Sequence, residues 1–262
     1  MMPAIRTLPS RKPTQLHFND MNNPSKTVIV TGASQGIGAG IVRAFLARGY
    51  NVVGTARNAT KSRELSASDH LALIDGDIGQ IETAQRVEEL ALKKFGSIDA
   101  VVANAGIFVV KPFTDYTADD FRALVTTNLL GFIHIAQLAV KQMQAQKTGG
   151  SIVSITAALA DNPIAGIPAS VAMITKGGLE SVTRHLAMEY AKQHIRFNAV
   201  APGVVDSPLH ANDPKEELQK QNPMGSISTV EDIAGAVVYL TEASHITGEV
   251  LHVDGGAHIG KW

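Results

Sequence analysis

Lys176 is the residue whose surroundings most strongly indicate a chemical role. It lies in the segment PASVAMITKGGLESVTRHL, residues 168–186, whose pattern predicts a helix of mostly small and apolar residues. Ala172 stands one helical turn before it, and two glycines follow it directly. A charged ammonium in apolar surroundings is costly unless something uses it. The pattern therefore predicts that Lys176 serves a ligand or a reaction.

A glycine-rich turn supplies a second chemical signal. Gly32, Gly36 and Gly38, in TVIVTGASQGIGAGIVRAFL, stand between the first predicted strand and the first predicted helix. Glycines at this point permit a tight turn and let a pyrophosphate lie close to the backbone at a helix N-terminus. The spacing is G-x-x-x-G-x-G rather than the commoner G-x-G-x-x-G, and glycines also end strands. Their position directly after the first strand nevertheless favours a dinucleotide site.

The end of the second predicted strand indicates which dinucleotide binds. Folds that bind NAD place an acid about 20 residues beyond the glycine turn, where it holds the ribose 2′-hydroxyl. Here that position holds Ala56, and Arg57 follows it. A missing carboxylate and a guanidinium together favour a 2′-phosphate and hence NADP(H), with NAD(H) as the less favoured choice. The alternative is a solvated surface arginine.

Three further strand ends carry residues suited to a ligand. Asp77 follows the third predicted strand, where its side chain can reach an adenine amino group. The segment NAG, 104–106, follows the fourth strand, and the segment PG, 202–203, turns the chain after the sixth. Open α/β sheets bind ligands at this edge. Any one of these segments could be an ordinary turn, but with the glycine turn they favour a shared site.

Seven short runs, nearly continuous in apolar residues, are typical of parallel strands covered on both faces. Helical patterns lie between them. This alternation predicts a doubly wound parallel sheet of the α/β class, in one domain over residues 26–262. The predicted strands are 27–31, 51–56, 71–75, 99–103, 151–156, 195–200 and 249–253, and the predicted helices are 36–48, 80–95, 117–146, 168–192 and 229–242.

The composition is that of an ordinary globular protein: 262 residues, 45% hydrophobic and 18% charged, with a formal net charge of -1. Near-neutral charge gives no support for a nucleic-acid or anionic-membrane partner. The absence of cysteine excludes disulfides, thiolate catalysis and cysteine-ligated metal, and it fits a cytoplasmic location. No metal site is predicted. The apolar run LLGFIHIAQLAV is shorter than the roughly 18 residues of a membrane span.

Two segments have a character of their own. Residues 1–25 contain four prolines and lack the apolar stretch of a signal peptide, which predicts a disordered or loosely attached extension. The predicted helix 117–146 is apolar nearly all round, which is typical of a helix buried on more than one side. It is either a well-covered core helix or one that packs on another subunit.

Taken in order along the chain, these motifs resemble those of the short-chain dehydrogenase/reductase family. The matching elements run from about residue 26 to the C-terminus: TGASQGIG, NAG, TTNLLG, GGSIVSI, TKGGL, RFNAVAPGVVDSPL and HVDGGAHIGKW. The resemblance implies a Rossmann-type three-layer α/β/α fold with a seven-stranded parallel sheet and a nicotinamide cofactor. It also implies a homo-oligomer, a tetramer or a dimer, with helices 117–146 and 168–192 at a subunit interface.

The resemblance further implies which positions hold the cofactor. With Arg57 where an acid would favour NAD, we expect NADP(H) there. The expected cofactor-binding residues are Gly32, Ser34, Gln35, Gly36, Ile37, Gly38, Arg57, Asp77, Ile78, Asn104, Ala105, Gly106, Lys176, Pro202, Gly203, Val205 and Ser207.

The catalytic group of the family is Asn-Ser-Tyr-Lys, and this sequence matches only half of it. In the family the tyrosine passes a proton to or from the substrate oxygen, the lysine binds the nicotinamide ribose and lowers the pKa of the phenol, the serine polarises the carbonyl, and the asparagine steadies a water. Asn128 and Lys176 match the asparagine and the lysine. The tyrosine position, four residues before the lysine, is Ala172, and the serine position falls on Ala157.

Several residues are candidates for the missing groups. Thr156 lies next to Ala157 and is the better choice for a carbonyl contact, although one step along a strand reverses the face. His210 in the substrate loop and Tyr116 after the fourth strand are weaker candidates for a proton donor. Lys176 itself can donate if burial lowers its pKa.

These observations give two functional hypotheses. The first is an NADP(H)-dependent oxidoreductase with a degenerate site, which transfers a hydride to or from a small carbonyl, imine or alcohol. The second is a catalytically inactive homologue that binds the cofactor and has a regulatory or structural role. The region 206–226 is predicted to form the substrate lid, and its polar composition argues mildly against a large flat apolar ligand.

Overall fold

The predicted parallel sheet is present. Its strand order changes direction beside the first strand, which leads into the predicted glycine turn. The computed structural model describes residues 25–260, so the predicted extension 1–25 lies outside the described residues except for Ser25. The sheet has seven parallel strands in the order β3-β2-β1-β4-β5-β6-β7. They are β1 (Thr27–Thr31), β2 (Asn51–Ala56), β3 (Leu71–Asp75), β4 (Ala100–Ala103), β5 (Gly150–Ile155), β6 (Ile195–Pro202) and β7 (Val250–Val253). The doubly wound α/β fold is therefore confirmed.

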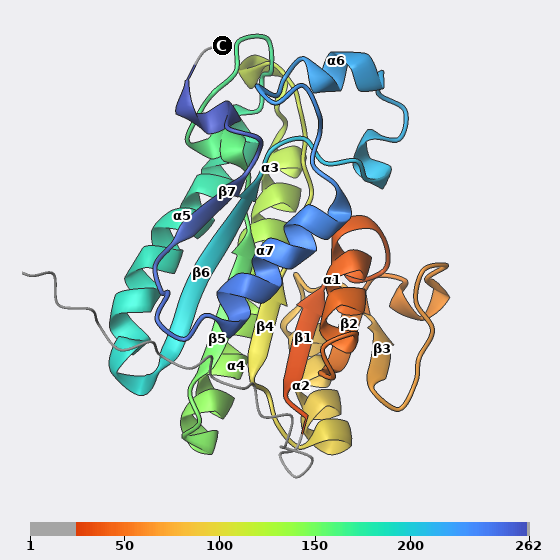
Figure 1. Ribbon diagram of the computed structural model, residues 1–262, viewed down its shortest axis with the longest axis vertical. Coiled ribbons are helices and arrows are strands. Elements are labelled where there is room, and N and C mark those ends of the chain that lie inside the picture. The colour runs from red at the N-terminus through yellow and green to blue at the C-terminus, as the bar shows by residue number, and fades with distance from the viewer. Residues whose placement is uncertain (1–24, 261–262) are drawn as a thin grey trace, which may run out of the picture.

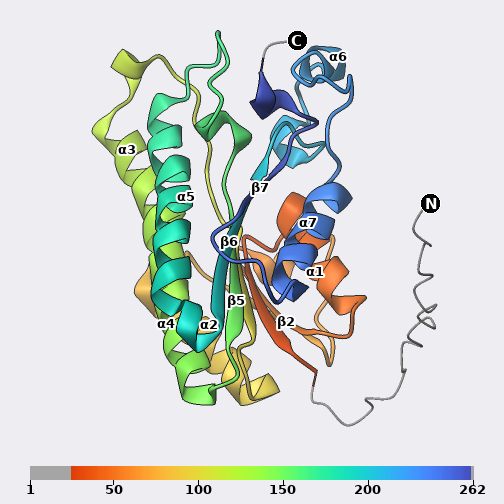
Figure 2. The same ribbon diagram turned by 60° about the vertical axis from the view of Figure 1, so that its left-hand side comes forward.

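Helices cover both faces of this sheet and give three layers (Figure 1). Figure 2 shows one layer with α1 (Gly36–Leu46) and α7 (Val230–Glu242). The opposite layer contains α2 (Ile81–Phe95), α4 (Gly131–Gln146) and α5 (Ser170–Tyr190). Four of these helices, α1, α2, α5 and α7, are predicted ones with ends that differ by at most two residues, and α4 is the second half of the predicted helix 117–146.

Each strand contributes alternate side chains to the two cores on either side of the sheet. Val28 and Val30 of β1 pack in the core that contains α1 and α7, whereas Ile29 packs in the core of α2, α4 and α5. Successive side chains of a strand point to opposite faces, so a strand buried on both sides is apolar throughout. This explains why the strands read as nearly continuous apolar runs in the sequence.

The predicted helix 117–146 consists of three segments joined end to end. They are α3 (Ala118–Leu124), a π-helical segment (Val125–Leu130) and α4. Together they form a run that is long and apolar enough to cross a membrane by length and composition, contrary to the expectation from the short apolar stretch within it. In this fold α4 packs on the sheet and beside α2, which is the place of a core helix.

The loops after the strands carry short elements that the sequence analysis missed. In the predicted lid these include α6 (Lys215–Gln219) and a single turn of 3₁₀ helix, Pro208–His210. Figure 1 shows α6 beyond the carboxyl ends of the strands. Such short helices depend on their surroundings rather than on a repeating apolar pattern, because an isolated helix of this length is unstable.

The start of α7 offers a direct test of the local structure. The Thr229 hydroxyl accepts a hydrogen bond from the backbone N–H of Asp232 at 3.1 Å, and the Asp232 carboxylate accepts one in return from the backbone N–H of Thr229 at 2.8 Å. We expect Thr229→Ala to lower the free energy of unfolding by about 1 kcal/mol, because the helix loses this cap. Thr229→Ser keeps the hydroxyl and should stay within a few tenths of the original value. Urea unfolding measures both, and equal stability of the two variants would contradict this role.

Candidate active site

The glycine-rich turn is held rigidly between β1 and α1. Gly32 has a positive φ of 67°, a conformation that residues with a Cβ rarely adopt. A Cβ at Gly38 would lie 2.1 Å from the carbonyl oxygen of Gly32, so no side chain fits there. The side-chain amide of Asn104 donates to the carbonyls of Thr31 at 3.0 Å and Gly32 at 3.2 Å, which fastens the end of β4 to this turn. Backbone N–H groups at the N-terminus of α1 can therefore bind an anion.

A carboxylate from the loop after β2 already contacts this turn. The backbone N–H of Gly36 donates to Glu64 Oε1 at 3.1 Å, and the other carboxylate oxygen pairs with Arg43 at 2.9 Å. The hydroxyl of Ser62 also donates to the carbonyl of Ser34 at 2.6 Å. A phosphate that uses the Gly36 N–H must therefore displace the carboxylate. The sequence analysis did not identify Glu64, because the contact joins segments 28 residues apart.

The same loop brings positive charge to the site. Arg57, Lys61 and Arg63 line the cavity beside the glycine turn, and Arg57 is exposed as expected for a residue that meets a ligand. Only Arg57 was predicted. On the other side, Asp77 Oδ1 accepts the backbone N–H of Gly79 at 2.9 Å, which fixes the turn after β3.

Lys176 is buried at the carboxyl end of β5, with only 7% of its surface exposed. Its ammonium donates to the carbonyl of Ile155 at 2.8 Å. A Cβ at Gly106 would lie 3.2 Å from Lys176 Nζ and 3.3 Å from Asn128 Oδ1, so both side chains lie beside this glycine. Burial lowers the pKa of Lys176 to about 8, because the charged form loses its hydration.

Asn128 is placed by the π-helical segment. Its side-chain oxygen accepts the backbone N–H of Ile107 at 2.8 Å, and its amide donates to the carbonyl of Ile107 at 3.0 Å and to Thr175 Oγ1 at 2.9 Å. The amide therefore ties the loop after β4 to α5, the helix that carries Lys176. Single π-helical turns within helices are frequent at functional sites. The motif identified Asn128 in the sequence, but the widened turn has no comparable signal.

The predicted tyrosine position is filled by apolar packing. Ala172 is 0% exposed and packs with Leu124, Ala169 and Val171, in a cluster that Ile107, Phe108, Tyr116, Leu159 and Ile167 cover. The space around Ala172 is therefore filled by apolar side chains. Ala157, at the predicted serine position, lines the cavity and offers no hydroxyl.

The predicted substitutes for the missing groups already have partners. Thr156 lines the cavity, but its hydroxyl donates to the carbonyl of Val200 at 3.3 Å, so its one proton is engaged. The Tyr116 phenol donates to the carbonyl of Val109 at 2.6 Å. All four tyrosines lie in the described part of the chain, and none of them lines the cavity. His210 does line it, with Nδ1 2.8 Å from Asp213 Oδ2.

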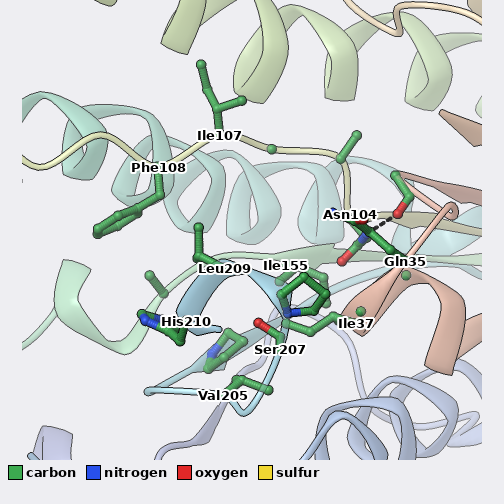
Figure 3. Close-up of a pocket in the computed structure, with 18 of the residues that line it drawn as sticks. Gln35, Ile37, Asn104, Ile107, Phe108, Ile155, Val205, Ser207, Leu209 and His210 are labelled. Carbon is green, nitrogen blue, oxygen red and sulfur yellow. Dashed lines mark hydrogen bonds between the residues drawn. The ribbon is translucent and has the colours of Figure 1, made fainter. Parts of the chain in front are cut away.

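These residues surround a cavity of about 1560 Å³ at the carboxyl ends of the strands. All the positions predicted to bind the cofactor line it, including Val205 directly before the predicted lid and Ser207 within it. Figure 3 shows Gln35 and Asn104 at one end, and Phe108, Leu209 and His210 at the other. The apolar side chains at the second end come mostly from the loops after β4 and β5. The polar composition of the predicted lid therefore did not indicate how apolar the rest of the substrate end is.

Comparisons with known proteins agree with this architecture. A family model described as Enoyl-(Acyl carrier protein) reductase matches residues 32–258. The 3beta-hydroxysteroid dehydrogenase 1 of Eggerthella lenta is 33% identical over 245 residues, which cover 88% of this chain and 93% of that protein. The 3-oxoacyl-[acyl-carrier-protein] reductase of Bos taurus is 36% identical over 238 residues, which cover 89% and 98%.

Solved structures give the same picture. The 3-ketoacyl-(acyl-carrier-protein) reductase from Brucella melitensis, complexed with NADH, has a TM-score of 0.84 at 29% identity and covers 89% of this chain and 98% of its own. ElxO with NADP bound has a TM-score of 0.83 at 28% identity and covers 90% and 100%. With a family model over most of its length and relatives above 30% identity, the chain belongs to the short-chain dehydrogenase/reductase family.

Proposed function

We propose that this chain is an NADP(H)-binding oxidoreductase with a degenerate active site, which transfers a hydride to or from a small carbonyl, imine or alcohol. The observation that carries the proposal is Lys176, a buried ammonium that lines the cavity and lies, like Asn128, beside Gly106. Family membership supports the reaction class. The solved relatives described with NADP and NADH support a nicotinamide dinucleotide.

The residues of the glycine turn fit such a dinucleotide. No side chain intrudes at Gly38, and the N-terminus of α1 offers backbone N–H donors for a pyrophosphate. Lys176 would hold the nicotinamide ribose, at the opposite side of the cavity from Arg57. When bound, the dinucleotide supplies or accepts the hydride.

The charge beside the glycine turn supports a preference for the 2′-phosphate. Three cationic side chains, Arg57, Lys61 and Arg63, line that end of the cavity. The residue before Arg57 is Ala56, so no carboxylate stands where it would bind the ribose 2′-hydroxyl. Arginine is suited to phosphate because its planar donors bind two oxygens at once.

Proton transfer is the step that the site supports least. General acid–base catalysis contributes roughly 10²- to 10⁴-fold, and no phenol is in place to supply it. Lys176, with a pKa of about 8, can release a proton near neutral pH. We propose that the substrate is either intrinsically reactive, supplies its own proton, or takes one from Lys176.

The closed packing around Ala172 favours a second candidate function. With Phe108 and Leu159 over the tyrosine position, the site can hold a cofactor without an acid for turnover. This would make the chain a cofactor-binding regulatory or structural homologue. Binding measurements together with activity measurements separate the two functions.

We also propose that the chain forms a homo-oligomer through helices 117–146 and 168–192. Five large apolar side chains are exposed on these helices: Phe121, Leu130, Ile133, Ile174 and Met188. Burial of such side chains against a second copy is favourable. The cytoplasmic location, which rests on the absence of cysteine, remains part of the same proposal.

Titration with NADPH tests the proposed function directly. We expect saturable binding, seen as a change in nicotinamide fluorescence. We also expect slow turnover of reactive carbonyls or imines, seen as a change in the nicotinamide absorbance band. Lys176→Met should weaken NADPH binding by at least about tenfold, because charged hydrogen bonds to the ribose are lost. Lys93→Met, on the exposed side of α2, is the matched control. Binding without any turnover would favour the second function, and no binding would contradict both.

Arg57→Ala tests the preference for the phosphorylated dinucleotide. We expect NADPH affinity to fall by about tenfold or more while NADH affinity stays nearly constant, because only NADPH carries the 2′-phosphate. The control is Arg48→Ala, an arginine that pairs with Glu242 and does not line the cavity. Equal losses for both dinucleotides would remove Arg57 from the phosphate site.

The lowered pKa of Lys176 predicts a specific dependence of stability on pH. Its pKa falls from 10.5 to about 8 on folding, so the buried charge costs stability below pH 8 and this cost disappears as the pH rises from 8 towards 10.5. Between pH 7.5 and 9.5 we expect the original chain to gain about 2 kcal/mol of unfolding free energy relative to Lys176→Met. Urea unfolding of the cofactor-free protein at both pH values measures this, with Lys93→Met as control. A constant difference would show that Lys176 is not desolvated.

A further inference from the structure

We propose that the substrate end of the cavity binds an uncharged ligand with an apolar body and a single carbonyl or hydroxyl group. The inference deepens the proposed function, because it assumes that this ligand exchanges a hydride with a nicotinamide. Its binding, however, can be measured without that reaction.

The first reason is the apolar wall of this end. It consists of side chains from the loop after β4, the loop after β5 and the lid: Ile107, Phe108, Val110, Leu159, Ile164, Ile167 and Leu209. Figure 3 shows Ile107, Phe108 and Leu209 away from Gln35 and Asn104, which mark the glycine-turn end. Val110 and Leu209 are exposed, with 50% and 66% of their surfaces accessible to solvent. Covering them with an apolar ligand is favourable.

The second reason is that the absent phenol extends this wall. Ala172 carries no ring, and Phe108, Leu159 and Ile167 pack against the apolar cluster that contains it. A tyrosine there would have presented a hydroxyl to the ligand. The wall is therefore apolar at the place where the family presents a polar group.

The third reason is that the polar side chains of this end are engaged. The Asn162 amide donates to the carbonyl of Ala257 at 2.6 Å, and the Thr156 hydroxyl donates to the carbonyl of Val200. His210 is paired with Asp213. Hydroxyl groups of a ligand would have to compete with these internal hydrogen bonds for the same donors, which lowers their contribution to binding.

Charge gives the fourth reason. The lid lines this end with the carboxylates of Asp213 and Glu217. They repel a phosphate or a carboxylate, and the cations Arg57, Lys61 and Arg63 lie beside the glycine turn instead. The polar lid and the apolar wall together therefore select for a neutral ligand.

The test compares two uncharged ketones, the bicyclic 2-decalone and a polyhydroxylated cyclohexanone. Calorimetric titration is done with the protein alone and with the protein saturated with NADP⁺, which cannot reduce a ketone. We expect 2-decalone to bind at least about tenfold more tightly than the polyhydroxylated ketone in both cases.

Phe108→Ser should weaken 2-decalone binding by about tenfold, because it removes the largest apolar contact of the wall. Phe113→Ser is the matched control: this ring is 71% exposed, lies outside the cavity lining, and should have no effect. Since Phe108 also covers the cluster around Ala172, Val110→Ser provides a second variant at an exposed wall position, with an expected loss of about threefold.

Two results would overturn the proposal: preference for the polyhydroxylated ketone, or unchanged 2-decalone binding in a folded Phe108→Ser or Val110→Ser variant. Failure of the proposed function looks different, because 2-decalone would then bind to the protein alone while NADPH would not bind.

Discussion

The burial of one ammonium group is the constraint on which the rest of the site depends. A lysine that loses its hydration is unfavourable unless its three N–H donors find acceptors. In this fold the carbonyl of Ile155 accepts one of them, and Lys176 Nζ and the Asn128 side chain both lie beside Gly106. The end of β5, the loop after β4 and the π-helical segment must therefore converge on one point of α5. The Lys176 ammonium also lines the cavity, where a ribose hydroxyl can accept a hydrogen bond from one of its remaining N–H donors.

Alanine at position 172 gives this part of the site an apolar character. Instead of an empty space, Ala172 is surrounded by the apolar side chains that also form the wall of the substrate end. The polar half of the cavity, around the glycine turn, is retained. Binding of a cofactor and transfer of a proton depend on different residues, so a chain can keep the first when the second is weakened.

The charged side chains at the glycine-turn end come from one loop. The loop after β2 brings Arg57, Lys61 and Arg63 to the glycine turn, together with Glu64, whose carboxylate occupies the Gly36 N–H. An anion at a helix N-terminus is stabilised by the same donors that a phosphate uses. This loop and an incoming dinucleotide therefore compete for one position, and the Arg43 side chain offers the displaced carboxylate a partner.

Local pattern and short spacing in the sequence were enough to predict the succession of strands and helices along the chain, the sheet class and the glycine turn. It also identified Lys176, Asn128, Ala172 and Ala157, because family motifs have fixed positions along the chain. The tertiary structure alone decided what surrounds them: the contact of Glu64 with Gly36, the engaged hydroxyls of Thr156 and Tyr116, and the apolar wall over Ala172. Each of these joins side chains from separate segments of the chain, and a local pattern contains no information on which distant side chain or carbonyl will be the partner.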